Sequence, residues 1–158
     1  MAYNGNGYRR VLVGVSGSLG GMTALHRAVS EARRFDAEVL AVMATSPAIH
    51  AVDQVEVERT MAERMLASLL ESAFGTGGRP PGLRFTAFAA LGGAGPVLTR
   101  MADRDGDLLV VGAPRRRLLP GFSTARYCTT HATCPVLVVP VPVLRRQDDG
   151  TRLHASEI

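Results

Sequence analysis

Short apolar runs alternate along this chain with longer segments in which apolar residues recur every three or four positions. Five runs predict β-strands, and most of them are the unbroken apolar sequence typical of strands covered on both faces. The longer segments have the amphipathic spacing of α-helices. The expected strands are Val11–Val15, Val39–Met43, Leu83–Ala90, Asp107–Val111 and Pro135–Val139, and the expected helices are Gly21–Phe35, Val52–Phe74, one beginning near Pro96, and Thr124–His131.

This alternation of strands and helices predicts a single α/β domain, in which a five-stranded parallel sheet carries helices on both faces. Ligands of such sheets bind beyond the carboxyl ends of the strands, where the strand order reverses. Two of these ends carry glycine: Ser16-Gly17-Ser18 after the first strand, and the residues from Gly112 onward after the fourth. Because a strand that runs through glycine into a helix presents free backbone N–H groups, this arrangement favours a nucleotide site.

Size and composition fit one ordinary globular domain. The chain has 158 residues, of which 46% are apolar and 20% charged. No apolar run reaches the roughly 18 residues of a membrane span, and the first residues lack the layout of a secretion signal. The two cysteines, Cys128 and Cys134, are expected to be reduced thiols. We therefore expect a cytoplasmic protein with no membrane contact.

The net charge of +4 comes from arginine alone, since the chain contains no lysine. The basic clusters Arg115–Arg117 and Arg145–Arg146 are not interleaved with aromatic residues, so the sequence predicts no nucleic-acid partner. The absence of lysine also excludes the phosphate loop Gly-x-x-x-x-Gly-Lys-Ser/Thr. Arg115–Arg117 is interpreted either as a solvated loop or as part of an anion site.

Other motifs point to no further chemistry. The segment Gly14–Gly21 is not Gly-x-Gly-x-x-Gly, and the second strand ends without the acid that would hold a dinucleotide ribose, which argues against NAD. The same segment lacks the aspartate of the Ser-Gly-Gly-x-Asp-Ser loop of adenylating amidotransferases. The four histidines have no convergent partners, and no catalytic triad, carboxylate pair or metal-ligand spacing is present. We expect no catalytic residues and no metal.

Three segments together resemble the universal stress protein family. They are Val11-Leu-Val-Gly-Val-Ser-Gly-Ser18, Asp107-Leu-Leu-Val-Val-Gly112 and His131-Ala-Thr-Cys-Pro-Val-Leu-Val-Val139, and the resemblance covers roughly Arg10 to Val141. It implies an adenine nucleotide alpha hydrolase-like sheet of strand order 3-2-1-4-5, a dimer, and in many members ATP. We accordingly expect a flexible N-terminus over residues 1–8, a family domain over 9–141, and a C-terminal extension or disordered tail over 142–158.

The ATP-binding branch of that family carries Gly-x2-Gly-x9-Gly-Ser/Thr after its fourth strand. In this chain Gly112 matches the first glycine and Arg115 stands at the second. Gly121 serves as the third, with five intervening residues instead of nine, and Phe122 takes the hydroxyl position. A glycine in a phosphate loop lets the backbone approach the anion closely, which arginine resists. Loss of two hydrogen bonds to phosphate would weaken binding by a factor on the order of 10² to 10⁴.

The rest of the family's nucleotide pattern is also altered. Ser123 and Thr124 follow Phe122, and Thr124 matches a further hydroxyl of the family, whereas the family's strand-one aspartate, expected to hold ribose, is Ser16 here. ATP is the one cofactor that the resemblance implies, across the ends of the first and fourth strands. The candidate contacts are Ser16, Gly17, Ser18, Ala44, Gly112, Arg115, Gly121, Ser123 and Thr124.

Two functions remain open from the sequence. The first is a stress-response module with a degenerate ATP site. The second is a binding module of the same fold that has lost the nucleotide and acts through a dimer surface or a protein partner, and the altered loop favours it. The apolar segment Val136–Val143 predicts a homodimer through the C-terminal strand, whose edge needs cover. Enzymatic activity, limited to slow ATP hydrolysis, ranks third because no general base is evident.

Overall fold

Strands and helices alternate along the chain as the sequence predicts. The structure, a computed structural model, describes residues 7–46, 52–114 and 123–142. All five expected strands and all four expected helices are present. They are β1 (Arg10–Gly14), α1 (Leu19–Phe35), β2 (Glu38–Thr45), α2 (Val52–Phe74), β3 (Phe85–Leu91), α3 (Ala94–Met101), β4 (Asp107–Gly112), α4 (Thr124–His131) and β5 (Val136–Val139).

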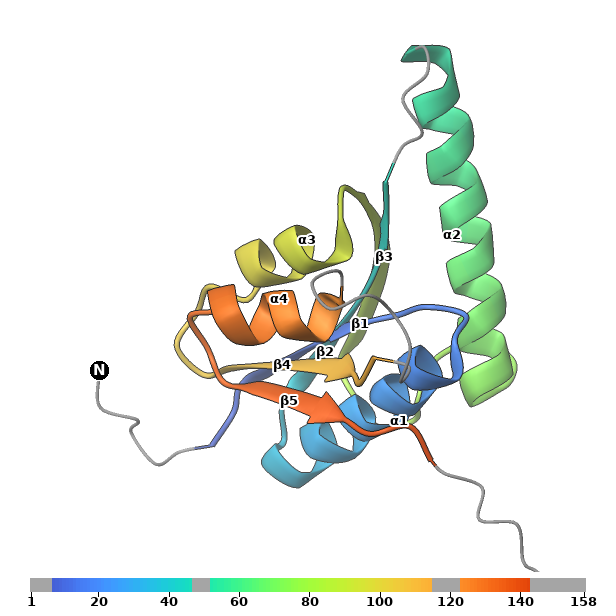
Figure 1. Cartoon of the computed structure of the whole chain (residues 1–158). Helices are drawn as coiled ribbons and strands as arrows, with labels where there is room; N and C mark the ends of the chain where they lie inside the picture. Colours follow the sequence, from blue (N-terminus) through green and yellow to red (C-terminus); the bar gives the residue numbers. More distant parts are fainter. Residues whose placement is uncertain (1–6, 47–51, 115–122, 143–158) are drawn as a thin grey trace, which may run out of the picture.

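The five strands form one sheet in the order β3-β2-β1-β4-β5, and every neighbouring pair is parallel. Helices α1 and α2 cover one face of the sheet, and α3 and α4 cover the other (Figure 1). The predicted strand order and layering are therefore confirmed. The order reverses between β1 and β4, which places the carboxyl ends of β1, β2 and β4 beside one another.

Each face of the sheet has its own apolar core. Along β1, Val11 and Val13 pack in the cluster that includes α1 and α2, whereas Leu12 packs in the cluster that includes α3 and α4. All three side chains are fully buried. This two-sided burial explains why the central strands read as unbroken apolar sequence, since a strand covered on both faces has no solvent-facing positions.

Helix α1 begins two residues earlier than the apolar spacing predicts, at Leu19 and not at Gly21. The Ser18 hydroxyl accepts a hydrogen bond from the Gly21 N–H at 3.1 Å, which makes Ser18 the N-cap. The helix ends where Asp36 takes the left-handed conformation, with a φ of 52°. The hydroxyl of Ser18 therefore sets the amino-terminal boundary of α1, and apolar periodicity does not reveal such a cap.

Helix α2 departs from the prediction at its methionines. The apolar spacing of this helix predicts that Met61 and Met65 pack in the core or in an interface, with Met65 in the buried stripe. Their exposed fractions are 64% and 58%, so their assignment to the core is wrong. The buried stripe contains Ala62, Leu66 and Leu70. Figure 1 shows the amino-terminal end of α2 extending beyond the sheet.

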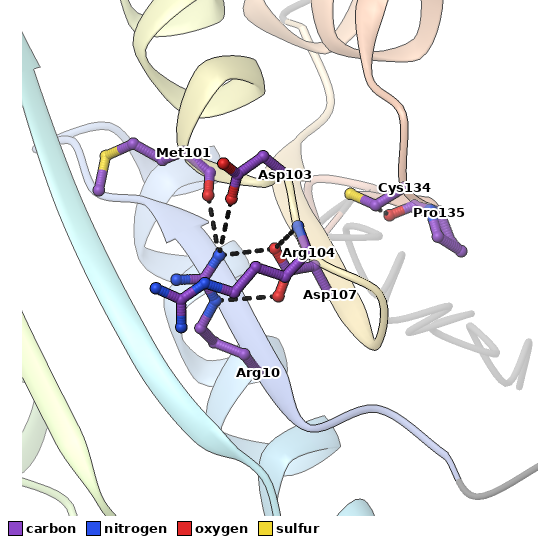
Figure 2. Close-up of polar contacts among 7 residues, drawn as sticks. All are labelled: Arg10, Met101, Asp103, Arg104, Asp107, Cys134 and Pro135. Carbon is purple, nitrogen blue, oxygen red and sulfur yellow. Dashed lines mark hydrogen bonds and ion pairs between the residues drawn. The ribbon is translucent and has the colours of Figure 1, made fainter.

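A buried ion pair joins β1 to β4 at the edge of the sheet opposite those carboxyl ends (Figure 2). Arg10 Nε and Nη2 donate to Asp107 Oδ1 and Oδ2 at 2.9 and 2.7 Å. Arg10 Nη2 also donates to the carbonyl oxygen of Met101 at 2.9 Å, and the Arg104 N–H donates to Asp107 Oδ2 at 3.0 Å. The hydrogen bond with Asp107 raises the pKa of Arg10. Because Arg10 and Asp107 are register partners, the pair stabilises the β1–β4 alignment.

Near the amino terminus, Tyr8 packs edge-on against Phe35, with ring centroids 5.0 Å apart. The expected flexible N-terminus and C-terminal tail fall largely on residues 1–6 and 143–158, which lie outside the described residues. Within the described residues, no helix combines the length and the apolar character that a membrane crossing needs.

Candidate functional site

The carboxyl ends of β1, β2 and β4 open into a cavity of about 340 Å³. This position is the one expected for a ligand site in an open parallel sheet, where the strand order reverses. Its volume falls in the range of small-molecule pockets. The lining residues are Gly14, Val15, Ser16, Ser18, Gly20, Gly21, Val42, Ala44, Ala94, Leu98, Val111, Gly112, Ala113, Pro114, Ser123, Thr124, Ala125 and Val141.

The first turns of three helices border this cavity. Gly20 and Gly21 belong to the first turn of α1, Ala94 begins α3, and Thr124 and Ala125 begin α4. The first N–H groups of a helix have no partner within it, and they carry the positive end of the helix dipole. None of the described lining residues has a charged side chain. The three helix ends therefore make the described cavity attractive to an anion without a fixed ionic partner.

Serine caps two of these helices. Ser18 Oγ accepts the Gly21 N–H of α1 at 3.1 Å, and Ser123 Oγ accepts the Arg126 N–H of α4 at 3.0 Å. Helix α3 has Gly93 at its N-cap, without a side-chain hydrogen bond. Because each serine occupies one N–H of its first turn, other N–H groups of those turns remain for a ligand.

The glycine at the end of β4 lets α1 approach this strand closely. A Cβ on Gly112 would lie 2.6 Å from the carbonyl oxygen of Gly20, which is closer than real Cβ contacts allow. Close packing of a strand end against a helix start is one of the reasons that nucleotide folds use glycine at such positions. The glycine at Gly112 is thus required by the fold itself, whether or not a phosphate binds beside it.

A pair of serine hydroxyls lies at the end of β1. Ser16 Oγ and Ser18 Oγ are 2.8 Å apart, and Ser16 is exposed. A Cβ on Gly21 would overlap the Ser16 hydroxyl and backbone, so the Ser16 side chain rests directly over Gly21. The position that holds ribose in the resembled family therefore carries a fixed neutral hydroxyl in this chain.

The wall on the β2 side of the cavity is apolar. Val42 and Ala44 come from β2, and Leu98 comes from α3. Such a wall suits the flat face of a base or another apolar ring, since ligand pockets combine apolar walls with a few placed polar groups. The cavity thus combines apolar side chains from β2 and α3 with the first turns of the three helices that border it.

Six of the nine residues expected to contact a nucleotide lie around this one cavity. They are Ser16, Ser18, Ala44, Gly112, Ser123 and Thr124. Gly17 is exposed and does not line it. Arg115 and Gly121 lie outside the described residues, as does the altered hydroxyl position at Phe122.

Several lining residues were not predicted from the sequence. Val42 could have been found, because it lies two positions before Ala44 and strand side chains alternate with a period of two. Ala94 and Val141 come from segments after β3 and β5, and no motif marks them. Their contribution depends on how separate segments meet in the folded chain.

The polar side chains that line the described cavity are serine and threonine hydroxyls. No described lining residue is a histidine, cysteine or carboxylic acid, and no cluster of metal ligands occurs in the described part of the chain. Burial, and to a smaller extent the charge of Cys134, raises the pKa of Cys128 to about 11. Burial also raises the pKa of Cys134. Both thiols are free, and these shifts keep them protonated at neutral pH.

Solved structures with the same architecture include several nucleotide complexes. A universal stress protein in complex with cAMP has a TM-score of 0.67 and 21% identity, over 85% of this chain and 99% of its own. An Arabidopsis thaliana family member with AMP bound has a TM-score of 0.57 and 16% identity, over 85% and 93%. The Archaeoglobus fulgidus protein in complex with dAMP has a TM-score of 0.53 and 17% identity, over 84% and 98%.

At these identities the likeness shows the fold, and it confirms the expected adenine nucleotide alpha hydrolase-like sheet. No protein in a search of curated sequences matches this chain. The sequence model of the universal stress protein family, however, matches residues 7–140. That match spans most of the 158 residues and contains all nine elements of the sheet and its helices. The chain therefore belongs to the universal stress protein family.

Proposed function

We propose that this protein is a stress-response module that binds a small adenine nucleotide in the cavity at the ends of β1, β2 and β4. The observation that carries the proposal is that the first turns of three helices border a cavity that also has apolar walls. The apolar wall of Val42, Ala44 and Leu98 suits the base. The first turn of α4 suits the phosphate, because helix amino termini bind anions.

The ligands of the similar structures support a nucleotide with a single phosphate. The three complexes contain cAMP, AMP and dAMP. In this chain Arg115 replaces the second glycine of the ATP loop, and the segment to Gly121 is shortened. Both changes weaken the support for a triphosphate more than the support for a monophosphate. We infer that AMP-sized ligands bind more tightly than ATP.

Isothermal titration calorimetry of the purified chain with AMP and with ATP tests the proposal. Ala44→Leu fills the part of the cavity proposed for the base and should weaken AMP binding by about five- to 150-fold, since overpacking costs roughly 1–3 kcal/mol. The matched control Ala67→Leu adds the same atoms to an exposed position of α2 and should leave binding unchanged. Mass spectrometry of small molecules released from freshly purified protein supplies an independent readout. Absence of binding to both nucleotides, with no adenine compound released, would contradict the proposal.

The proposal is one of binding and not of catalysis. Hydrolysis of a phosphate ester needs a group that activates water, and the described lining residues hold no carboxylate or imidazole for that role. A cytoplasmic location belongs to the same proposal, supported by the two free cysteines, which are usual in a reducing compartment.

A second candidate function, a protein-binding module that acts as a dimer, is favoured by the edge strand β5. The Leu109 N–H donates to the Pro135 carbonyl, and the Ala113 N–H donates to the Val139 carbonyl. In a parallel ladder this pattern turns the N–H of Val138 away from β4. A second copy could therefore pair with that edge of the sheet.

Light scattering on Val138→Pro tests this dimer, because proline removes an outward N–H while the β4–β5 ladder stays intact. We expect the variant to be monomeric at concentrations at which the wild-type chain is a dimer. A dimer of unchanged stability in the variant would rule out pairing through β5. Circular dichroism of the variant should retain the wild-type spectrum, which separates loss of the dimer from loss of the fold.

A further inference from the structure

The sheet has two edge strands, and β3 is the one that carries no device against pairing. The strand order places β3 at one end of the sheet and β5 at the other (Figure 1). Strand β3 has 7 residues, none of them charged and none a proline. Strand β5 has 4 residues and lies between Pro135 and Pro140. Because charges and prolines are the usual means of blocking an edge, β3 is the edge that favours a further strand.

The hydrogen bonds between β2 and β3 show which backbone groups of β3 face outward. The Val39 N–H donates to the Arg84 carbonyl at 2.9 Å, and the Gly92 N–H donates to the Thr45 carbonyl at 2.8 Å. In a parallel ladder these bonds turn alternate residues of β3 toward β2 and the others away from it. The outward-facing residues are Phe85, Ala87, Ala89 and Leu91. No backbone hydrogen bond to their outward groups occurs among the described residues.

The outward-facing residues are arranged symmetrically about Phe88. If a second copy lies antiparallel to β3 with its Phe88 opposite this one, Ala87 faces Ala89 of the second copy and Phe85 faces its Leu91. Each of these pairs exchanges two N–H···O=C bonds, as the hydrogen-bonded pairs of an antiparallel ladder do. Small side chains then lie opposite small ones, and large opposite large. The edge is therefore complementary to itself, which a two-fold contact requires.

A hollow beside β3 matches the side chain that this register brings to it. The hollow has a volume of about 240 Å³, and it is bordered by Phe85 and Ala87 of β3 and by Leu70 of α2. Phe85, Ala87 and Ala89 pack on the α2 face of the sheet, and the alternation of side chains places Leu91 on that face as well. Leu91 of a second copy, opposite Phe85, therefore lies beside the hollow and fills it with an apolar side chain.

Exposed carboxylates limit the strength of such a contact. Ala67 of α2 lines the same hollow, and Glu63 and Glu71 lie four residues before and after it on the same row of the helix. In a two-fold contact the carboxylates of both copies gather on one side of the joined sheet, and salt screens their repulsion. We therefore expect a contact through β3 to need higher protein and salt concentrations than the proposed dimer through β5.

We propose that β3 is a self-association surface of this protein. Two copies pair antiparallel about Phe88, their sheets join into one, and Leu91 of each copy occupies the hollow of the other. This surface is separate from the nucleotide proposal and does not depend on it. Because no residue of β3 lines the cavity as described, the contact leaves the cavity open.

Disulfide cross-linking tests the register of this pairing. Thr86 lies opposite Ala90 of the second copy in a non-hydrogen-bonded pair, whose Cα atoms are about 4.5 Å apart, within the range of disulfides. The double variant Thr86→Cys with Ala90→Cys should form a disulfide-linked dimer with oxidised glutathione at high protein concentration and about 1 M salt. Thr86→Cys alone is the matched control. It should form no such dimer, because the two positions 86 are offset by about 13 Å along the strands.

Sedimentation equilibrium of the full chain measures the strength of the contact. Ala87→Pro removes an outward N–H while the ladder to β2 stays intact, and it should weaken the association about five- to 150-fold, since the two-fold contact loses two hydrogen bonds. Leu91→Ala leaves the hollow unfilled and should weaken the association about fivefold or more. Val138→Pro places a proline on the other edge and should leave the association through β3 unchanged.

The outcomes either support this surface or overturn it. A cross-linked dimer of the double variant, absent from the single variant, supports the register. Equal cross-linking of the two cysteine variants would overturn the register, and absence of concentration-dependent association of Val138→Pro at about 1 M salt would overturn the surface itself. Each variant should retain the wild-type circular dichroism spectrum, which separates loss of the contact from loss of the fold. Nucleotide binding is measured separately by calorimetry, so its failure would leave this proposal unaffected.

Discussion

At the residue scale, the absence of a side chain is what matters at Gly112. The backbone of Gly20 lies so close that a Cβ on Gly112 would be 2.6 Å from its carbonyl oxygen. A backbone atom cannot rotate away as a side chain can, so β4 or α1 would have to shift to make room for that Cβ. Gly17, three residues before Gly20, contrasts with it, because a Cβ there would meet nothing within 4 Å.

Gly112→Ala should therefore lower the free energy of unfolding by about 1–3 kcal/mol, the usual cost of overpacking. Gly17→Ala is the matched control, and it should leave stability unchanged or raise it by up to about 1 kcal/mol through the lower entropy of the unfolded chain. Urea denaturation followed by circular dichroism measures both. Equal stability of the two variants would show that α1 and β4 do not require this close approach.

A second residue-scale feature is the fully buried thiol of Cys128, whose pKa is raised from 9.0 to about 11, first by burial and then by the charge of Cys134. The folded state thus favours the protonated thiol more than the unfolded state does. The resulting stability is fully present below pH 9, the unfolded value, and it is lost as the pH rises through about 11.

Cys128→Ala should remove this loss of stability at alkaline pH. Between pH 9 and pH 11 the unfolding free energy of the wild-type chain should fall more steeply than that of the variant, because the Cys128 thiol loses its proton in the unfolded chain while burial keeps it protonated in the folded chain. Urea titrations at several pH values in that window measure the difference. The other groups that titrate at alkaline pH are the same in both proteins. Parallel curves of unfolding free energy against pH would therefore contradict a contribution from Cys128.

At the scale of the element, helix α2 carries apolar residues on two different faces. Ala62, Leu66 and Leu70 are buried against the core. Val57, Met61 and Met65 recur every four residues, with exposed fractions of 58%, 64% and 58%. Because four-residue spacing fits a helix stripe whether it faces the core or the solvent, the sequence pattern alone does not tell the two faces apart.

Leu66→Ala should destabilise the protein by about 2–5 kcal/mol, since it leaves a cavity in the core. Met65→Ala, one residue earlier on the exposed face, should change stability by no more than about 0.5 kcal/mol. Thermal and urea unfolding of the two variants measure the contrast. A large loss of stability for Met65→Ala would mean that this face is covered in solution, for example by another molecule.

At the scale of the whole molecule, the cavity of the candidate site and the buried ion pair lie at opposite edges of the sheet. Arg10 and Asp107 bring the starts of β1 and β4 together, with side-chain exposures of 12% and 1% (Figure 2). The same two strands end in Gly14 and Gly112, which line the cavity. The ion pair therefore supports the alignment of the two strands whose ends shape the site.

Asp107→Asn should destabilise the fold by up to about 3–5 kcal/mol, because it leaves the Arg10 charge with only the exposed carboxylate of Asp103, 3.6 Å away. Replacement of both residues, as Arg10→Met with Asp107→Leu, should recover much of this loss, since apolar pairs of similar volume often substitute for buried ion pairs. The exposed Asp105→Asn is the control and should be neutral within about 0.5 kcal/mol. A double variant as unstable as the single one would show that the hydrogen bonds to Met101 and Arg104 matter more than the charges.

Apolar periodicity was sufficient to predict all nine elements, whereas the strand order was expected only from the family resemblance. It was also sufficient to place Ser16, Ser18, Ala44 and Gly112 at the carboxyl edge of the sheet, because parallel strands end on one side. It was not sufficient for Met65, whose spacing suits either face of a helix. Nor did it reveal the pairing of Arg10 with Asp107, which are distant in sequence and meet only through strand register.

The amino-acid sequence by itself determined the α/β alternation, the family and the edge of the sheet at which a ligand can bind. These properties follow from local patterns of burial and from the position of glycine and serine after apolar strands. Only the tertiary structure decided that Gly112 meets the backbone of Gly20, that Ser16 is hydrogen-bonded to Ser18 over Gly21, and that three helix ends share one cavity. The physical reason is that side-chain periodicity shows which face of an element is buried, whereas the distance between two backbones is set by the packing of the whole sheet and its helices.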